Sequence, residues 1–146
     1  MDRLERFPVT NAVIDFPRIE GADRIQVEPE FALLCDIVYH SDSMENKRVE
    51  ALMPRKVAAF NDCSIRSLEG SEKLSEKKNW GFGSKGISLD SFVLETPSEF
   101  TKSGSVSNLG LTSYVKRDGE IFQYTETVPG RNYLLFYEPL LEWIVE

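Results

Sequence analysis

VEPEFALLCD, residues 27–36, joins two glutamates to a dense apolar run and predicts the first long strand of the fold. The apolar side chains are most dense at residues 31–34, and the predicted strand spans residues 24–38. Because side chains alternate along a strand, Glu28 and Glu30 project from the same face and Pro29 from the other. Proline is confined to strand starts, edges and bulges, so we expect the glutamates where this strand begins.

A second apolar strand is expected at residues 56–61 (KVAAFN), and it ends directly before Asp62. Between the two strands, Asp42 and Glu45 form a pattern typical of a helix capping box. The short helix expected there ends at Pro54 and carries apolar side chains at the i, i+3 and i+4 positions. These side chains are Val49, Leu52 and Met53.

The remaining segments predict an exposed loop, a hairpin and a terminal helix. Residues 67–86 are rich in Ser, Glu, Lys and Gly around Trp80, and a short strand is expected at residues 92–94. Asp118-Gly119, between β-prone runs within residues 111–127, predicts a two-residue hairpin turn. Glu138-Pro139 opens a C-terminal helix, because proline is tolerated in the first turn. Its apolar stripe is Leu140, Leu141, Ile144 and Val145.

The length of 146 residues fits one domain spanning residues 1–146. The expected strands, hairpin and two short helices together indicate a β-rich α+β fold. A net charge of −7 argues against nucleic acid and against an anionic membrane surface as partners. Cys35 and Cys63 have no CxxC spacing and are expected to be reduced thiols. No signal peptide and no apolar run of membrane-spanning length is found, so we expect a soluble cytoplasmic protein.

The pair Glu28 and Glu30 has two interpretations. Two carboxylates on one strand face repel each other unless a cation lies between them, and a hard divalent ion such as Mg²⁺ or Ca²⁺ prefers oxygen ligands. Taken alone, the pattern Glu-x-Glu favours a solvated strand end over a metal site.

Two later motifs add candidate side chains. NDCSIR, residues 61–66, places Asp62 at a strand end and Arg66 where it can bind a carboxylate in a bidentate fork, although Asn-Asp is also a turn signal. GFGSKGISLDSF, residues 81–92, contains Lys85 in a glycine-rich loop followed by Asp90 and Ser91. It lacks the phosphate-loop pattern and is a weak signal on its own.

In this order, the motifs resemble the fumarylacetoacetate hydrolase family. That family carries Glu-x-Glu on a strand, an NDxSxR segment, and a loop with a tryptophan and a Gly-Lys motif followed by Asp-Thr. The resemblance implies mixed sheets and a β-roll of the type found in that family's C-terminal domain, with short flanking helices. It also implies that Glu28, Glu30 and Asp62 bind a divalent metal, Mg²⁺ first and Ca²⁺ or Mn²⁺ as alternatives.

The same resemblance implies a function. The metal would chelate a small 2-oxo acid or 1,3-dicarbonyl compound and stabilise the enolate formed in hydrolysis, decarboxylation or isomerisation. Lys85 would neutralise the developing oxyanion, Arg66 would position the substrate, and Asp90 and Ser91 would contact it. A homodimer is expected. Two alternatives stay open: a non-catalytic metal-binding relative without a general base, and an acidic β-rich interaction module.

The chain departs from the family pattern in its surroundings. The upstream segment with a His and a Glu and the glycine-rich segment after the last helix have no counterpart. Three interpretations stay open: a fragment that is incomplete at both ends, a divergent short member of the family, or half of a site completed by another chain. Its one histidine, His40, is expected in a turn and is not assigned as a base. The loop from Lys85 to Asp90 is also longer than in the family.

Overall fold

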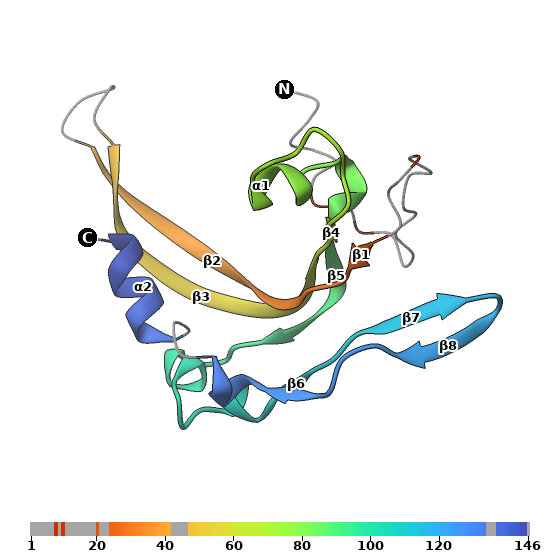
Figure 1. Cartoon of the computed structure of the whole chain (residues 1–146). Coiled ribbons are helices and arrows are strands. Elements are labelled where there is room, and N and C mark those ends of the chain that lie inside the picture. Colours follow the sequence, from red (N-terminus) through yellow and green to blue (C-terminus); the bar gives the residue numbers. More distant parts are fainter. Residues whose placement is uncertain are drawn as a thin grey trace. The chain divides into compact units, whose positions relative to one another are not determined.

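The computed structural model describes residues 8, 10, 20, 24–41, 47–133 and 137–145 (Figure 1). These residues form a β-rich α+β fold of small antiparallel sheets with two short α-helices, which confirms the expected fold class at this level. They fall into two compact units. The first unit takes its described residues from 1–32, 58–90 and 112–126, and the second from 33–57, 91–111 and 127–146. The single domain expected over residues 1–146 stays a prediction.

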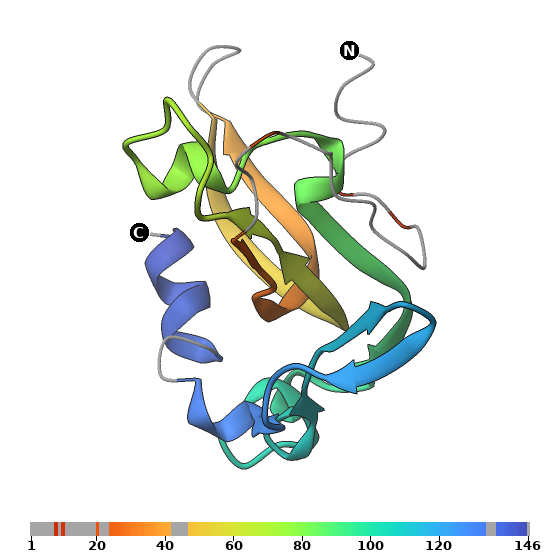
Figure 2. The same ribbon diagram turned by 45° about the vertical axis from the view of Figure 1, so that its right-hand side comes forward.

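The longest strands form one three-stranded sheet. Its order is β2 (Pro29–Ser41), β3 (Lys47–Asp62) and β5 (Lys85–Val93), with β3 in the middle. Figures 1 and 2 both show β2 and β3, in orange and yellow, running side by side. The strands expected at residues 24–38 and 56–61 are therefore confirmed, and the second is longer than its apolar run suggested. The short strand expected at residues 92–94 is the end of β5.

The helix expected before Pro54 is wrong where the structure describes that segment, because the chain continues as β3. The apolar stripe assigned to this helix lies in the strand: Val49, Leu52 and Met53. Here β3 runs alongside β2, and Glu50 Oε2 lies 3.9 Å from His40 Nδ1. Pairing with the preceding strand β2 outweighs a weak local helix preference. The expected cap residues Asp42 and Glu45 lie outside the described residues.

Pro54 lies inside β3, next to the residue at which the hydrogen bonds between β3 and the β5 side end. The Cys63 N–H donates to the Ser84 carbonyl at 2.8 Å, and the Leu94 N–H donates to the Arg55 carbonyl at 2.9 Å. These two bonds bracket the pairing of β3 with β5.

In the segment expected as a loop, residues 67–86, the elements before β5 begins at Lys85 are single turns. They are α1 (Leu74–Lys77) and the 3-10 helix η2 (Phe82–Ser84). The start of α1 is closed by Glu76, whose Oε2 accepts hydrogen bonds from the backbone N–H groups of Glu72 at 3.1 Å and Lys73 at 3.2 Å. Such a cap fixes where the helix begins, and so where its last turn points.

The predicted hairpin is confirmed. Strands β7 (Tyr114–Arg117) and β8 (Glu120–Gln123) pair antiparallel around Asp118-Gly119 (Figure 1). Asp118 has φ 51° and Gly119 has φ 88°. Two central residues with positive φ are the requirement of a type I′ turn, which matches the twist of the strands it joins.

Beneath the ends of the long strands, the first unit has a small buried core. The two-residue strands β1 (Ile25–Gln26) and β4 (Ser64–Ile65) pair antiparallel. Cys63 and Ile65 are both 0% exposed. The chain immediately after Asp62 is therefore held on the inside of this unit, which limits where the Asp62 side chain can lie.

Besides parts of the long strands β2, β3 and β5, the second unit contains several short elements. They are η3 (Pro97–Phe100), η4 (Ser105–Asn108), β6 (Gly110–Leu111), β9 (Val128–Pro129), η5 (Gly130–Asn132) and α2 (Glu138–Val145). The rings of Phe100 and Tyr137 pack with their centroids 5.5 Å apart. The helix predicted from Glu138-Pro139 is confirmed as α2, although none of its residues is buried. In the described part of the chain, no helix has the length and apolar character needed to cross a membrane.

Candidate metal centre

Strand pairing gathers the three acids named from the sequence. Glu30 is the second residue of β2, Glu28 lies just before that strand, and Asp62 is the last residue of β3. The backbone N–H of Asp62 donates to the Glu28 carbonyl at 3.0 Å, which aligns the two strand ends. Each of the three side chains offers a carboxylate oxygen, and these atoms lie within 4.8 Å of one another. The three predicted ligands are therefore neighbours.

Lys85 reaches the same place from β5. The hydrogen bond from the Cys63 N–H to the Ser84 carbonyl sets the start of β5 beside the end of β3. The Lys85 ammonium forms an ion pair with Asp62 Oδ1, and it also donates to the backbone carbonyl of Lys78. Its side chain is only 16% exposed. Lys85 thus links Asp62 to the loop that follows α1.

Arg66 approaches from the other side of Glu28. The Arg66 N–H donates to the Arg24 carbonyl at 2.7 Å, next to the paired strands β1 and β4. Its guanidinium Nη2 lies 3.0 Å from Glu28 Oε1, while its Nε donates to Gln26 Oε1 at 2.6 Å. The bidentate fork on one carboxylate, considered from the sequence, is instead divided between a carboxylate and an amide.

Lys78 is the member of this group that sequence reasoning missed. It is the C-cap residue of α1, and its ammonium lies 2.7 Å from Glu28 Oε2 and 2.7 Å from Asp62 Oδ2. Its side chain is 19% exposed. The run KLSEKK contains Lys73, Lys77 and Lys78, and no sequence signal separates Lys78 from the other two. Only the fold of the loop selects it.

The charges of the group balance: three carboxylates face two lysines and an arginine. Burial alone would raise the pKa of Asp62, but hydrogen bonds from Lys78 and Lys85 hold it below its ordinary value. The pKa of Glu30 is raised, first by burial and then by the negative charge of Asp62. Among the described residues, Glu30 has no ion pair. It is the one acid of the three whose charge is poorly compensated.

The donor set fits a hard divalent cation. Carboxylate oxygens are the ligands that Mg²⁺, Ca²⁺ and Mn²⁺ prefer. The nearest soft candidate is Cys63, next in sequence to Asp62. Its thiol is 0% exposed, and burial followed by the charge of Asp62 raises its pKa to about 11, so it stays protonated. The chemistry of the site is therefore oxygen chemistry.

The other residues named from the sequence lie elsewhere. Asp90 is exposed and is the fifth residue after Lys85 along β5, which corresponds to roughly 17 Å of strand. Its backbone N–H donates to Ser88 Oγ at 3.1 Å, and Ser91 follows it in the same strand. The structure does not bring Asp90 or Ser91 to the three carboxylates. His40, expected in a turn, is a strand residue of β2 and faces Glu50.

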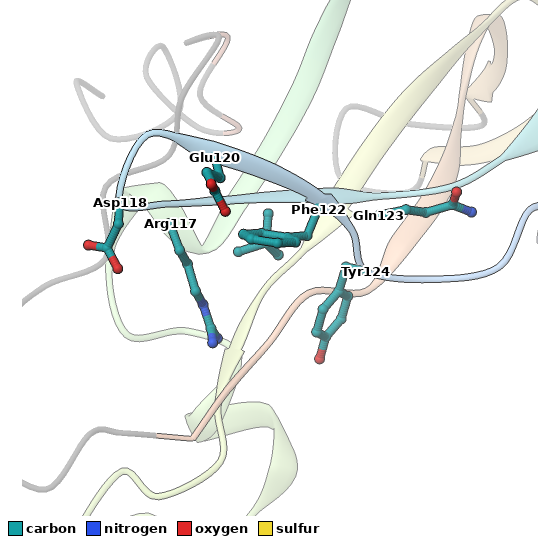
Figure 3. Close-up of a pocket in the computed structure, with 7 residues that line it drawn as sticks. Arg117, Asp118, Glu120, Phe122, Gln123 and Tyr124 are labelled. Carbon is teal, nitrogen blue, oxygen red and sulfur yellow. The ribbon is translucent and has the colours of Figure 1, made fainter.

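A separate concave surface lies along the hairpin β7–β8 and encloses about 450 Å³ (Figure 3). Its lining residues are Val115, Arg117, Asp118, Glu120, Phe122, Gln123 and Tyr124. Figure 3 shows the side chains of Arg117 and Tyr124 extending to the same side of the hairpin. No residue predicted as a site from the sequence lines this hollow, and it contains no cluster of acids suited to a metal.

Comparison with known proteins corrects the family assignment. The model described as "Family of unknown function (DUF5718)" matches residues 1–146, so the chain belongs to that family. The resemblance to the fumarylacetoacetate hydrolase family is therefore wrong, and the β-roll inferred from it loses its basis. The motifs behind it total about a dozen positions, and acids at strand ends followed by turn residues occur in unrelated β-rich proteins. No curated protein and no solved structure matches the chain.

Proposed function

We propose that this member of the DUF5718 family binds a divalent cation at Glu28, Glu30 and Asp62. We further propose that it acts on a small anionic 2-oxo acid or 1,3-dicarbonyl compound, as a hydrolase, lyase or isomerase. The observation that carries the proposal is the convergence of three carboxylate oxygens within 4.8 Å. Basic side chains from three further segments surround them.

The charge balance argues for an anionic ligand. Without a metal, the acids and the basic groups Lys78, Lys85 and Arg66 cancel one another in formal charge. A bound divalent cation leaves the site with two excess positive charges in a partly buried setting. A site of that charge attracts a carboxylate or dicarboxylate and disfavours a neutral or cationic compound.

The basic residues have distinct tasks in this proposal. A bound divalent cation would supply Lewis-acid stabilisation of negative charge on a substrate oxygen. Lys85, 16% exposed and anchored on Asp62, would stabilise negative charge that develops when a proton or a carbon–carbon bond next to a carbonyl is lost. Arg66 uses two of its five N–H donors on Gln26 and Glu28, so further donors can orient a carboxylate.

Metal binding is the first test. Mn²⁺ is titrated into the wild-type chain and into the Glu28→Ala, Glu30→Ala double variant, with Glu120→Ala, Glu126→Ala as a control of equal charge change on the hairpin side of the unit. We expect saturable binding in the wild type and the control and a loss of at least about 100-fold in the site variant. Equal binding by all three proteins would refute the metal centre.

Turnover is the second test. The Mg²⁺-loaded wild-type chain is assayed on oxaloacetate and on an acylpyruvate, with Lys85→Met as the comparison. We expect activity with at least one of these substrates and its loss in the variant. A folded, metal-loaded protein that turns over neither compound would refute the enzyme reading for these substrates and leave a non-catalytic metal-binding protein.

A second candidate function rests on one observation: Lys78 bridges Glu28 and Asp62 at 2.7 Å to each. An ammonium in this position can make the network a metal-free structural element of an acidic β-rich interaction module. In that case Mg²⁺ and Mn²⁺ leave the thermal unfolding midpoint unchanged, whereas a metal-binding native state is stabilised by them.

A further inference from the structure

Every carboxylate oxygen of Glu28 and Asp62 faces a cation of the chain. Glu28 Oε1 lies 3.0 Å from Arg66 Nη2 and its Oε2 lies 2.7 Å from Lys78 Nζ. Asp62 Oδ2 lies 2.7 Å from Lys78 Nζ, and its Oδ1 is paired with Lys85. A divalent cation that uses all three acids must therefore displace at least one of these basic groups, because two cations on the same oxygens repel each other strongly.

The three basic groups are not held equally. The Lys85 ammonium has a second acceptor in the Lys78 carbonyl, and the Arg66 guanidinium has a second acceptor in Gln26. The Lys78 ammonium is bound by the two carboxylates, both of which are proposed metal ligands. Its backbone belongs to the C-terminus of the one-turn helix α1. Lys78 is therefore the group that can leave at the lowest cost.

We infer that Lys78 is an exchangeable internal counter-cation: its ammonium neutralises Glu28 and Asp62 until a divalent cation replaces it, and it then binds the anionic ligand. This inference rests on the proposed function and assigns a role to a residue within that site. Lys85 continues to hold the Lys78 carbonyl, so the released ammonium stays close to the site. Metal binding thereby creates part of the anion site, and the two ligands are thermodynamically coupled.

If Lys78 exchanges with the metal, the variant Lys78→Met should bind the divalent cation more tightly and the anion more weakly. Lys78→Met removes the competing ammonium and keeps most of the side-chain volume. Mn²⁺ is expected to bind Lys78→Met about 10-fold more tightly than it binds the wild type, because it no longer displaces a positive charge. In the presence of saturating Mn²⁺, oxalate, used as a small dianionic probe, is expected to bind Lys78→Met about 10-fold more weakly.

Lys77→Met is the matched control. It makes the same charge change one residue earlier, at a side chain with no ion pair among the described residues, and it is expected to leave both affinities within about 2-fold of the wild type. Calorimetric titration measures both affinities at constant ionic strength. If Lys78→Met binds Mn²⁺ no more tightly than the wild type, the displacement model is overturned. Unchanged oxalate binding overturns the anion-binding role.

A measurement on the wild-type chain covers the case in which Lys78→Met fails to fold. The lysine side-chain ammonium and Cε signals are followed by NMR while Mg²⁺ is added. The Lys78 signal is expected to shift with Mg²⁺ occupancy, whereas the Lys77 signal stays in place. A Lys78 signal that does not respond to bound Mg²⁺ overturns the inference alone. Absence of Mg²⁺ and Mn²⁺ binding overturns the proposed function together with it.

Discussion

Replacing Asp62 with asparagine tests how strongly the charge network stabilises the fold. The substitution keeps the shape of the side chain and the backbone hydrogen bond to Glu28, and it removes one negative charge. In the native structure that charge lies between two lysine ammoniums, and the Asp62 side chain is 13% exposed. Hydrogen bonds to charged groups contribute about 1.5–3 kcal/mol each, and breaking a buried pair leaves an uncompensated charge. Because some solvent reaches the lysines and the amide oxygen still accepts one bond, we expect a loss of about 2–3 kcal/mol.

Asp36 provides an exposed comparison: it pairs with one arginine at 2.7 Å, the same distance that separates Asp62 from Lys78. Arg55 Nε lies 2.7 Å from Asp36 Oδ2, but these side chains are 56% and 58% exposed. Exposed ion pairs contribute about 0–1 kcal/mol, so Asp36→Asn is expected to cost less than about 1 kcal/mol. Urea unfolding at pH 7 without divalent metal, followed by circular dichroism, measures both variants. A loss in Asp62→Asn no greater than that in Asp36→Asn would refute the view that the network is stabilising.

Three further predictions concern the turn, a cap and the thiols. Gly119→Ala is expected to lower the free energy of unfolding in urea by about 1 kcal/mol, because Gly119 has φ 88°. Gly81→Ala is the control: an added Cβ also meets open space there, but φ is extended, so a much smaller loss is expected. Equal losses in the two variants would contradict the type I′ assignment. Hydrogen bonds from the Thr96 backbone N–H, then the Ser105 hydroxyl and the Glu95 backbone N–H, hold the pKa of Glu99 below its ordinary value of 4.5. The stability that the Glu99 carboxylate contributes is therefore present above pH 4.5 and lost as the pH falls through the lowered pKa. The difference in unfolding free energy between the wild type and Glu99→Gln should vanish when unfolding is measured at decreasing pH. A difference that does not change with pH would be inconsistent with this. Thiol labelling of the native protein at pH 8 should modify Cys35 well before Cys63, because Cys63 is 0% exposed and its pKa is raised to about 11. A fast labelling phase that survives in Cys35→Ser would contradict this order.

Local signals in the sequence predicted local structure well. Asp118-Gly119 determines its own turn, because a type I′ turn needs two residues that tolerate positive φ. Glu138-Pro139 likewise marks a helix start by the geometry of proline alone. The apolar run after Glu30 predicted β2 because burial on a sheet needs little more than alternating or dense hydrophobic side chains.

Features that depend on distant contacts were not predictable in the same way. The helix expected from Val49, Leu52 and Met53 was wrong because three positions fit a helix and a strand, and the partner strand decides between them. Lys78 was missed because its role depends on how the loop after Asp62 returns to the strand ends. The proximity of Glu28, Glu30 and Asp62 was predicted from a resemblance to a family to which the chain does not belong. The three carboxylates are nevertheless close together, because antiparallel pairing of β2 and β3 brings the two strand ends side by side. The metal, the substrate, the homodimer and the cytoplasmic location remain predictions.

Whether Glu28, Glu30 and Asp62 form a divalent-cation site is decided by comparing Mn²⁺ binding to the wild type and to the Glu28→Ala, Glu30→Ala variant. Manganese is suited to the measurement because its free and bound forms are distinguished by electron paramagnetic resonance. We expect one saturable site in the wild type that disappears in this variant and persists in Glu120→Ala, Glu126→Ala. Wild-type protein that leaves the free Mn²⁺ signal unchanged, or a site variant that binds Mn²⁺ as the wild type does, would contradict this expectation.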